Sequence, residues 1–171
     1  MAEWFRRKSE KIKTFDKREI AEGLWTKCPR CTEVVYRKIL EENNFVCSSC
    51  SHHFRISSRD YIRLLLDETL EEIASNIISV DVLEFVGTKK YSDQLKEARE
   101  KTGSKDAVST YIGIIDGFKT VIAIMDFRFI GGSMGSVVGE KISQAIDKAR
   151  EDKLPLLIIT ASGGARMQEG A

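Results

Sequence analysis

The chain has 171 residues, 42% of them hydrophobic, and its 27 basic and 26 acidic side chains leave a net charge of +1. This composition is typical of a soluble globular protein and excludes a disordered or fibrous chain. A near-neutral chain also lacks the overall positive field through which many proteins attract nucleic acid. The length allows one domain of usual size, or a small module joined to part of a larger domain.

The first 22 residues are polar and basic, with a few apolar side chains among the charges. We interpret 1–22 as a basic, solvated N-terminal segment. It has neither the apolar stretch nor the small-residue cleavage site of a secretory signal. The longest strongly apolar run, Leu154 to Ala161, is too short to span a bilayer. We therefore expect a cytoplasmic protein without membrane insertion.

Four cysteines follow in residues 23–56. Cys28 and Cys31 form one Cys-x2-Cys pair, Cys47 and Cys50 form a second, and fifteen residues separate the pairs. Disulfides are rare in a reducing cytoplasm, whereas each pair can turn tightly enough to present two thiolates to one metal ion. The pattern predicts a ribbon that binds one structural zinc ion with four sulfurs. A rubredoxin-like iron site and a pair of redox dithiols stay open as alternatives.

Other side chains near the cysteines allow a second interpretation of the ribbon. His52 and His53 follow a complete set of four cysteines, so we expect them to lie outside the ligand set. Basic and aromatic side chains could contact nucleic acid, or they could form the solvated rim of a small module. These residues are Lys27, Arg30, Arg37, Lys38, Arg55 and Arg59, with Tyr36 and Phe54.

Residues 57–171 have the pattern of an α/β domain. Ser57 or Ser58 can cap a helix whose apolar side chains, up to Leu66, share one face. A second helix is predicted over 92–102, where Gly103 ends it. The apolar runs 107–115 and 118–125 are separated only by Asp116-Gly117, a dipeptide that favours a tight type I′ turn, and they predict a β-hairpin.

The remaining elements follow a glycine-rich loop over 126–135. Apolar residues from Val138 to Ala149 recur at helical spacing, and Pro155 follows the predicted helix end. Residues 156–160 indicate a buried strand, after which Ser162-Gly163-Gly164 turns the chain into a new helix near Ala165. The order suggests repeating β-β-α layers that should continue, so we expect this chain to be the front part of a longer protein.

Two glycine loops are the candidates for chemistry. The 131–136 loop could cradle a phosphate, but it lacks the lysine of a P-loop, and glycines that permit close backbone approach explain it equally well. The 161–166 corner could direct amide groups at a developing oxyanion, although a plain tight turn would have the same sequence. Ser162 has no histidine in local reach, so a serine nucleophile is disfavoured.

Motifs along nearly the whole chain resemble the carboxyltransferase β subunits of bacterial-type, multi-subunit acetyl-CoA carboxylases. They include the ribbon around Trp25-Thr26-Lys27-Cys28-Pro29-Arg30-Cys31 and Cys47-Ser48-Ser49-Cys50-Ser51-His52-His53. The others are Lys101-Thr102-Gly103-Ser104-Lys105-Asp106-Ala107, Gly131-Gly132-Ser133-Met134-Gly135-Ser136-Val137-Val138-Gly139 and Ala161-Ser162-Gly163-Gly164-Ala165-Arg166-Met167-Gln168-Glu169.

The resemblance implies a four-cysteine zinc ribbon followed by the first part of a crotonase-like β-β-α spiral, here residues 57–171. It implies transfer of a carboxyl group from carboxybiotin, carried on the biotin carboxyl carrier protein, to acetyl-CoA, which gives malonyl-CoA for fatty-acid synthesis. The implied partners are the carboxyltransferase α subunit and biotin carboxylase. The family's β subunit is longer, so we expect this chain to be inactive alone.

The resemblance also implies roles for the glycine loops. The backbone amides of Gly163 and Gly164 would form an oxyanion hole for the thioester enolate or for the urea oxygen of biotin. Binding of the acyl-CoA substrate is assigned to Gly131, Gly132, Ser133, Met134, Gly135, Ser136 and Arg166. The zinc ligands would be Cys28, Cys31, Cys47 and Cys50.

Overall fold

A computed structural model describes residues 23–170, so the basic segment 1–22 lies outside the described residues. The chain divides into two compact units with a boundary between Phe54 and Arg55. That boundary is close to residue 56, where the sequence analysis ends the ribbon. Within residues 23–170, no helix is both long enough and apolar enough to cross a membrane.

The first unit is a small ribbon built from two short strands and one helix. Strand β1 (Trp25–Lys27) pairs antiparallel with β2 (Val34–Tyr36), and α1 (Arg37–Glu42) follows directly. Val46 forms an isolated antiparallel bridge with His53, whereas Phe45 before it has a positive φ of 59°. The sequence analysis did not anticipate α1, whose only buried residue is Leu40. So short a helix has little periodicity to reveal it.

In the second unit, helix α2 (Ser58–Leu65) begins where the sequence predicts. The Ser57 hydroxyl accepts a hydrogen bond from the Asp60 N–H at 3.1 Å, and the Asp60 carboxylate accepts one from the Ser57 N–H at 3.0 Å. This reciprocal capping box satisfies amide groups that the first helical turn leaves unpaired. A serine three residues before an acidic side chain is therefore sufficient to locate the start of α2.

A four-stranded sheet forms the centre of the second unit, in the order β3-β4-β5-β6. Strand β4 (Val108–Ile115) pairs antiparallel with both β3 (Glu68–Ile73) and β5 (Phe118–Met125). Asp116 and Gly117 have φ angles of 49° and 79°, which are the positive values that a type I′ turn requires. The predicted hairpin is confirmed.

Strand β3 has no counterpart in the sequence analysis. Three of its six residues are glutamates, five of the six are exposed, and a register shift lies between Thr69 and Glu71. An exposed edge strand can carry charges on both faces, so the usual alternation of apolar and polar residues is lost.

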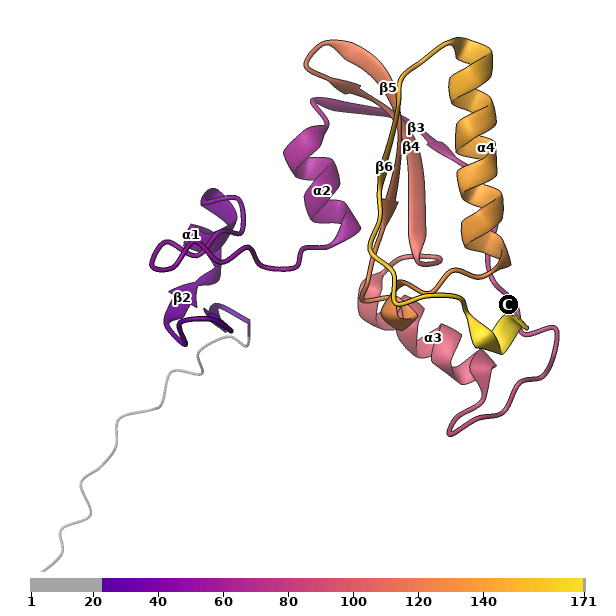
Figure 1. Cartoon of the computed structure of the whole chain (residues 1–171), viewed down its shortest axis with the longest axis horizontal. Coiled ribbons are helices and arrows are strands. Elements are labelled where there is room, and N and C mark those ends of the chain that lie inside the picture. Colours follow the sequence, from indigo (N-terminus) through magenta and orange to yellow (C-terminus); the bar gives the residue numbers. More distant parts are fainter. Residues whose placement is uncertain (1–22, 171) are drawn as a thin grey trace, which may run out of the picture. The chain divides into compact units, whose positions relative to one another are not determined.

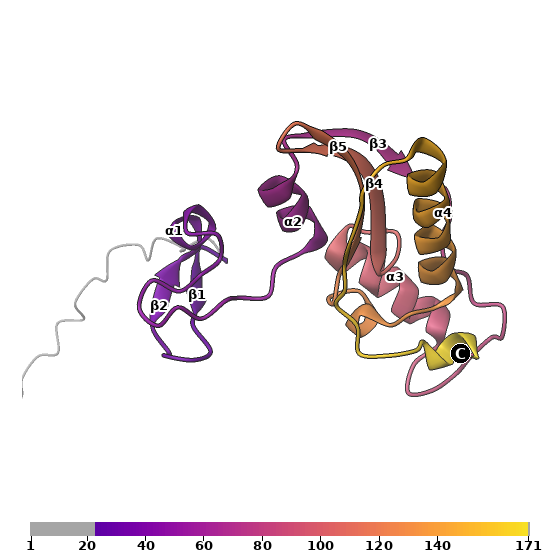
Figure 2. The same cartoon turned by 45° about the horizontal axis from the view of Figure 1, so that its top comes forward.

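Helices cover both faces of this sheet. The predicted helices are found as α3 (Tyr91–Thr102), which Gly103 ends with a φ of 66°, and α4 (Ser136–Asp152). Figures 1 and 2 show α2 and α4 on opposite faces of the strands. One apolar cluster joins α3, the ends of β4 and β5, and the first turns of α4, and a second lies where α4 crosses the middle of the sheet. The first cluster includes Phe129 and packs against Ile130 and Ala161, so it holds in place the loops that follow β5 and β6.

Two expectations for the last part of the chain are wrong. Strand β6 (Leu156–Ile159) pairs in parallel with β5, but it is not buried, because no described strand lies on its other side; Leu157 and Ile158 are each 37% exposed. The helix expected from Ala165 is only a single 3-10 turn, η2 (Met167–Glu169). Ala165 instead forms a parallel bridge with Met134, so its backbone is extended and cannot begin a helix.

Candidate metal centre and paired glycine loops

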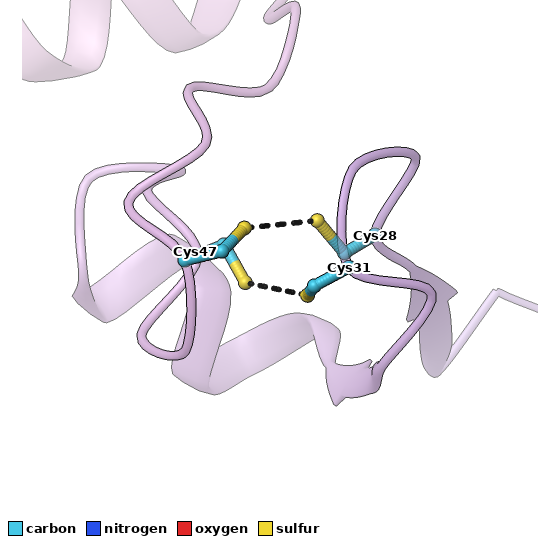
Figure 3. Close-up of side chains that lie close together, drawn as sticks. Cys28, Cys31 and Cys47 are labelled. Carbon is cyan, nitrogen blue, oxygen red and sulfur yellow. Dashed lines mark hydrogen bonds between the residues drawn. The ribbon is translucent and has the colours of Figure 1, made fainter.

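The four cysteines of the ribbon converge on one point. Their sulfur atoms all lie within 4.8 Å of one another. Figure 3 shows the sulfur atoms facing each other as two pairs. The sulfur atoms of Cys28 and Cys50 are 3.6 Å apart, and those of Cys31 and Cys47 are 3.7 Å apart. Cys28 and Cys47 are buried, and the other two are partly buried. No disulfide joins them.

The two Cys-x2-Cys pairs use the same backbone turn. The Thr32 N–H donates to the Cys28 carbonyl at 2.9 Å, and the Ser51 N–H donates to the Cys47 carbonyl at 2.9 Å. Thr32 and Ser51 also share a positive φ, 64° and 56° respectively. Each turn therefore aims two thiols to the same side, at the cost of an uncommon conformation for a non-glycine residue.

The geometry of the four sulfurs fits zinc. A tetrahedral site with Zn–S bonds of ~2.3 Å has sulfur–sulfur edges of ~3.8 Å, close to the two measured distances of 3.6 and 3.7 Å. The histidines are outside this set, as expected: His52 packs edge-on against Phe54 with ring centres 5.4 Å apart, and His53 is exposed. Four sulfurs fill every tetrahedral position, so the centre suits a structural role.

In the second unit, the 131–136 loop comes after β5. Its first two residues belong to the short 3-10 helix η1 (Ile130–Gly132). Ile130, Gly131 and Gly132 have φ angles of 45°, 65° and 64°. At Gly132 a side chain is also excluded by space, because a Cβ atom would clash with the carbonyl oxygen of Ala161. The glycines thus permit close backbone approach, which is one of the two explanations that the sequence left open.

Backbone hydrogen bonds join this loop to the 161–166 corner. The Gly163 N–H donates to the Gly131 carbonyl, the Met134 N–H donates to the Gly164 carbonyl, and the Arg166 N–H donates to the Met134 carbonyl, each at 2.9 Å. The sequence treats the loops as neighbours, whereas the structure makes them one paired platform. We call residues 131–136 and 161–166 together the paired loops.

The two predicted oxyanion donors differ in how they are engaged. Gly163 donates its N–H to a main-chain acceptor, Gly131, and so helps to hold the paired loops together. The Gly164 N–H donates only to the hydroxyl of Ser162, at 3.0 Å, and a Cβ built on Gly164 would meet nothing within 4 Å. A side-chain hydroxyl can rotate away more easily than a main-chain carbonyl can move. The Gly164 N–H is therefore the donor whose acceptor a ligand could replace more easily.

Arg166 is placed differently from the substrate contact expected of it, because its side chain is fully buried. Its guanidinium forms an ion pair with the equally buried Asp106 at 2.8 Å and donates to the Ser133 carbonyl at 2.8 Å. It also contacts the carboxylate of Glu169 at 3.3 Å. Burial alone would lower the pKa of Arg166, but the hydrogen bond and charge of Asp106 outweigh burial and raise it. Arg166 supports the paired loops from beneath.

Glu169 connects the paired loops to two helices. Its carboxylate accepts hydrogen bonds from the Ser136 N–H at 2.7 Å, from the Ser136 hydroxyl at 2.8 Å, and from the hydroxyl of the buried Tyr91. Burial would raise the pKa of Glu169, but the hydrogen bonds from Tyr91 and Ser136 and the charge of Arg166 lower it to about 2. Burial and the contact with Glu169 raise the pKa of Tyr91 to about 12.

Sequence reasoning assigned no role to Tyr91, Asp106 or Glu169. Asp106 and Glu169 do stand within motifs that carry the family resemblance, and Asp106 directly precedes an apolar strand. A carboxylate at the start of a buried strand is a signal in itself, because a buried charge requires a partner. That partner, Arg166, is sixty positions away, so spacing alone could not identify it.

A cavity of about 420 Å³ lies beside Ser162 in the second unit. The guanidinium of Arg55 lies over the ring of Phe127, 4.5 Å from its centre. The cavity thus combines a cation and an aromatic ring with Ser162, whose hydroxyl accepts the hydrogen bond from the Gly164 N–H. Its lining consists of Arg55, Ile56, Tyr61, Phe127, Thr160, Ala161 and Ser162.

Two family models match the chain. Residues 73–171 match the carboxyl transferase domain, and residues 25–50 match the acetyl-CoA carboxylase zinc finger domain. The second match covers the four cysteines. The first covers both paired loops, Asp106 and Glu169.

Curated relatives and a solved structure agree with these matches. The chain is 50% identical to the acetyl-coenzyme A carboxylase carboxyl transferase subunit beta of Prochlorococcus marinus (strain MIT 9211), over 98% of this chain and 59% of that protein. It is 51% identical to the same subunit of Microcystis aeruginosa, over 98% of this chain and 54% of that protein. A transcarboxylase 12S structure with methylmalonyl-coenzyme A bound aligns with a TM-score of 0.55 and 27% identity, over 68% of this chain and 21% of that chain. The chain thus spans somewhat more than half the length of these curated relatives.

Proposed function

The chain belongs to the carboxyl transferase domain family, and from this we propose that it is the N-terminal part of an acetyl-CoA carboxylase carboxyltransferase β subunit. In this proposal it works in the cytoplasm with the carboxyltransferase α subunit, the biotin carboxyl carrier protein and biotin carboxylase. The reaction moves a carboxyl group from carboxybiotin to acetyl-CoA and yields malonyl-CoA and biotin. The support is the combination of a four-cysteine ribbon and the paired loops in one chain.

The chemistry requires stabilisation of negative charge on the thioester oxygen. Carboxybiotin would release CO2 when the bond between its ring nitrogen and the carboxyl carbon breaks. That ring nitrogen would then accept the proton that acetyl-CoA loses from its α carbon. The resulting enolate forms the new C–C bond to CO2. Fixed amide donors lower the barrier because they stabilise the oxyanion more than the neutral thioester.

The Gly164 amide is the single observation that best supports this function. It belongs to the paired loops, two residues after Ser162, which lines the cavity, and its only acceptor among the described residues is the Ser162 hydroxyl. An oxyanion would replace that hydroxyl and would find a donor already in position. Gly163 contributes by holding the paired loops together, because its own N–H is engaged by Gly131.

We propose further that the ribbon binds one zinc ion through Cys28, Cys31, Cys47 and Cys50. The measured sulfur distances support zinc, and the family match names a zinc finger domain. Four thiolates leave no position for a substrate, so this metal would act only on structure.

Kinetics of the assembled carboxyltransferase with its α subunit would test the oxyanion assignment. Gly164→Pro removes the donor, and we expect kcat to fall by roughly 10²–10³-fold. Proline cannot adopt the φ of 133° found at Gly164, so Ser162→Ala provides a second variant that leaves the backbone unchanged. Ser162→Ala should keep kcat/KM or raise it, because it frees the amide. A hundredfold loss in Ser162→Ala would assign the role to the hydroxyl and refute the amide.

Contact between the ribbon and nucleic acid is a second candidate function. Trp25 is 54% exposed and lies with its ring centre 5.3 Å from that of Tyr36, so the ribbon offers an aromatic face. Lys27, Arg30 and Lys38 are exposed as well. Neutralising Arg30, Arg37 and Lys38 should then weaken binding and reduce its salt dependence. Binding that does not respond to salt would refute this candidate.

A further inference from the structure

Glu169 occupies a special place at the end of the paired loops. The pairing ends at the hydrogen bond from the Arg166 N–H to the Met134 carbonyl. One turn, η2, then leads to Glu169. Its carboxylate then reaches back to the first residue of α4, where it accepts both the N–H and the hydroxyl of Ser136. The segment that ends in Glu169 is thus attached at both ends to the 131–136 loop: by backbone pairing at one end and by this carboxylate at the other.

The space around Glu169 gives an independent sign of this role. Gly135 has a φ of −101°, which any residue adopts, so its conformation does not require glycine. A Cβ at Gly135 would nevertheless lie 2.5 Å from a carboxylate oxygen of Glu169 and 2.7 Å from its carboxyl carbon. The absence of a side chain at Gly135 therefore leaves the space that the Glu169 carboxylate occupies.

The surroundings of the carboxylate fix its orientation. Tyr91 on α3 donates from one side, and the fully buried guanidinium of Arg166 lies at 3.3 Å on another. Only 11% of the Glu169 side chain is exposed. Hydrogen bonds to a charged acceptor in such a site are stronger than those between neutral groups. The short backbone pairing of the paired loops has few bonds of its own and gains most from such support.

We propose that Glu169 is a positioning residue: its hydrogen bonds to Ser136 hold the paired loops together, so that the Gly164 amide keeps its direction toward the substrate. We call this contact between Glu169 and Ser136 the latch. This inference rests on the proposed function only for its kinetic consequence. The latch itself is a property of the fold, and it can be measured without substrate.

Amide hydrogen exchange on the chain tests the latch directly. Glu169→Gln keeps the size of the side chain and removes its charge. Glu140→Gln is the matched control, because Glu140 lies on α4, the helix whose first residue Glu169 contacts, and its carboxylate accepts a hydrogen bond from the nearby Gln144 side chain at 2.7 Å. In Glu169→Gln we expect the amides of Met134 and Arg166 to exchange about 10- to 100-fold faster, with a smaller increase in the hairpin of β4 and β5. Unchanged exchange at Met134 and Arg166 would overturn the proposal.

A second variant keeps the proposal testable if Glu169→Gln does not fold. Gly135→Ala displaces the carboxylate with a methyl group and alters no hydrogen-bonding group. It should reproduce the faster exchange of Met134 and Arg166 at a similar melting temperature. Protection equal to that of the unmodified chain would likewise overturn the latch.

Kinetics of the assembled enzyme separate the latch from the proposed function. Loss of positioning should lower kcat about tenfold or more, with a much smaller change in the KM for the acyl-CoA. Glu169→Gln, which can still accept a bond from Ser136, should retain more activity than Glu169→Ala. Faster exchange with unchanged kcat would confirm the latch and refute the use of the paired loops in catalysis.

Discussion

The ribbon and the α/β unit hold their candidate sites in opposite ways. The ribbon buries few apolar side chains, and its two turns meet at four sulfur atoms and at one side-chain hydrogen bond, from Arg30 to the Cys50 carbonyl. The paired loops lie against a continuous apolar cluster and over the buried ion pair of Arg166 and Asp106. One site therefore needs a bound metal to exist, whereas the other is set by packing and hydrogen bonds that the chain supplies itself.

Removal of the metal should have the largest effect and should break the comparison most clearly. Chelation, or Cys47→Ser, should unfold the ribbon, because metal binding in such modules is worth on the order of 10 kcal/mol. The α/β unit should keep its thermal transition, since it has its own core. Proteolysis and zinc content report on the ribbon, and calorimetry reports on the α/β unit. Ser48→Ala in the same turn is the control. A ribbon that keeps its fold without metal would contradict this view.

Asp106→Asn should have the next largest effect, on the α/β unit alone. It leaves the buried Arg166 without the closer of its two charged partners, which costs about 3–5 kcal/mol and lowers the melting temperature by about 10–20 °C. The control is Asp147→Asn, because Asp147 pairs with Arg150 on the surface, where both side chains are at least 60% exposed. That variant should change stability by less than about 1 kcal/mol. Equal effects of the two variants would show that burial does not matter.

Acid should remove the contribution of Glu169 before that of the apolar core. Its pKa is about 2 in the folded chain and 4.5 ordinarily, so its stabilisation is complete above about pH 5 and falls as the pH drops from 4.5 toward 2. The neighbouring Tyr91 and Arg166 have raised pKa values and do not titrate in this range. Urea unfolding should find Glu169→Gln about 1–3 kcal/mol less stable at pH 6, with a smaller difference at pH 3. A constant difference would count against the assignment.

The smallest expected effect is in the ribbon turns. Thr32→Gly should be neutral or should stabilise the metal-bound ribbon by up to about 1 kcal/mol, because Thr32 has a φ of 64° that glycine adopts freely. Thr26→Gly is the matched control in the extended strand β1, where it should destabilise. Competition with a zinc chelator measures both. If the two variants behave alike, the positive φ carries no strain.

Local patterns explain why much of the fold was predictable. Asp116-Gly117 specified the hairpin turn, Ser57 or Ser58 located the start of α2 to within one residue, and Gly103 specified the end of α3. The two Cys-x2-Cys pairs likewise brought four ligands to one point. Each of these signals acts over a few residues, or through a known metal geometry.

The errors arose where distant residues decide the outcome. Ala165 follows two glycines that could start a helix, but its pairing with Met134 keeps the backbone extended. Arg166 stands in a motif that suggests contact with a substrate, but its side chain is buried in an ion pair with Asp106. Strand β3 is paired with β4 through its backbone. Its charged side chains lack the alternating pattern of a strand and would fit an exposed helix as well. None of these partners can be identified from spacing in a single sequence.

The absence of room at Gly132 limits how this protein can change. A single methyl group there would push the Ala161 carbonyl away and separate the paired loops. Variants that change the size of the cavity should therefore leave Gly132 unaltered and alter Tyr61 and Phe127 in its walls instead. Those side chains can change in size while the main chain that would bind the oxyanion stays where it is.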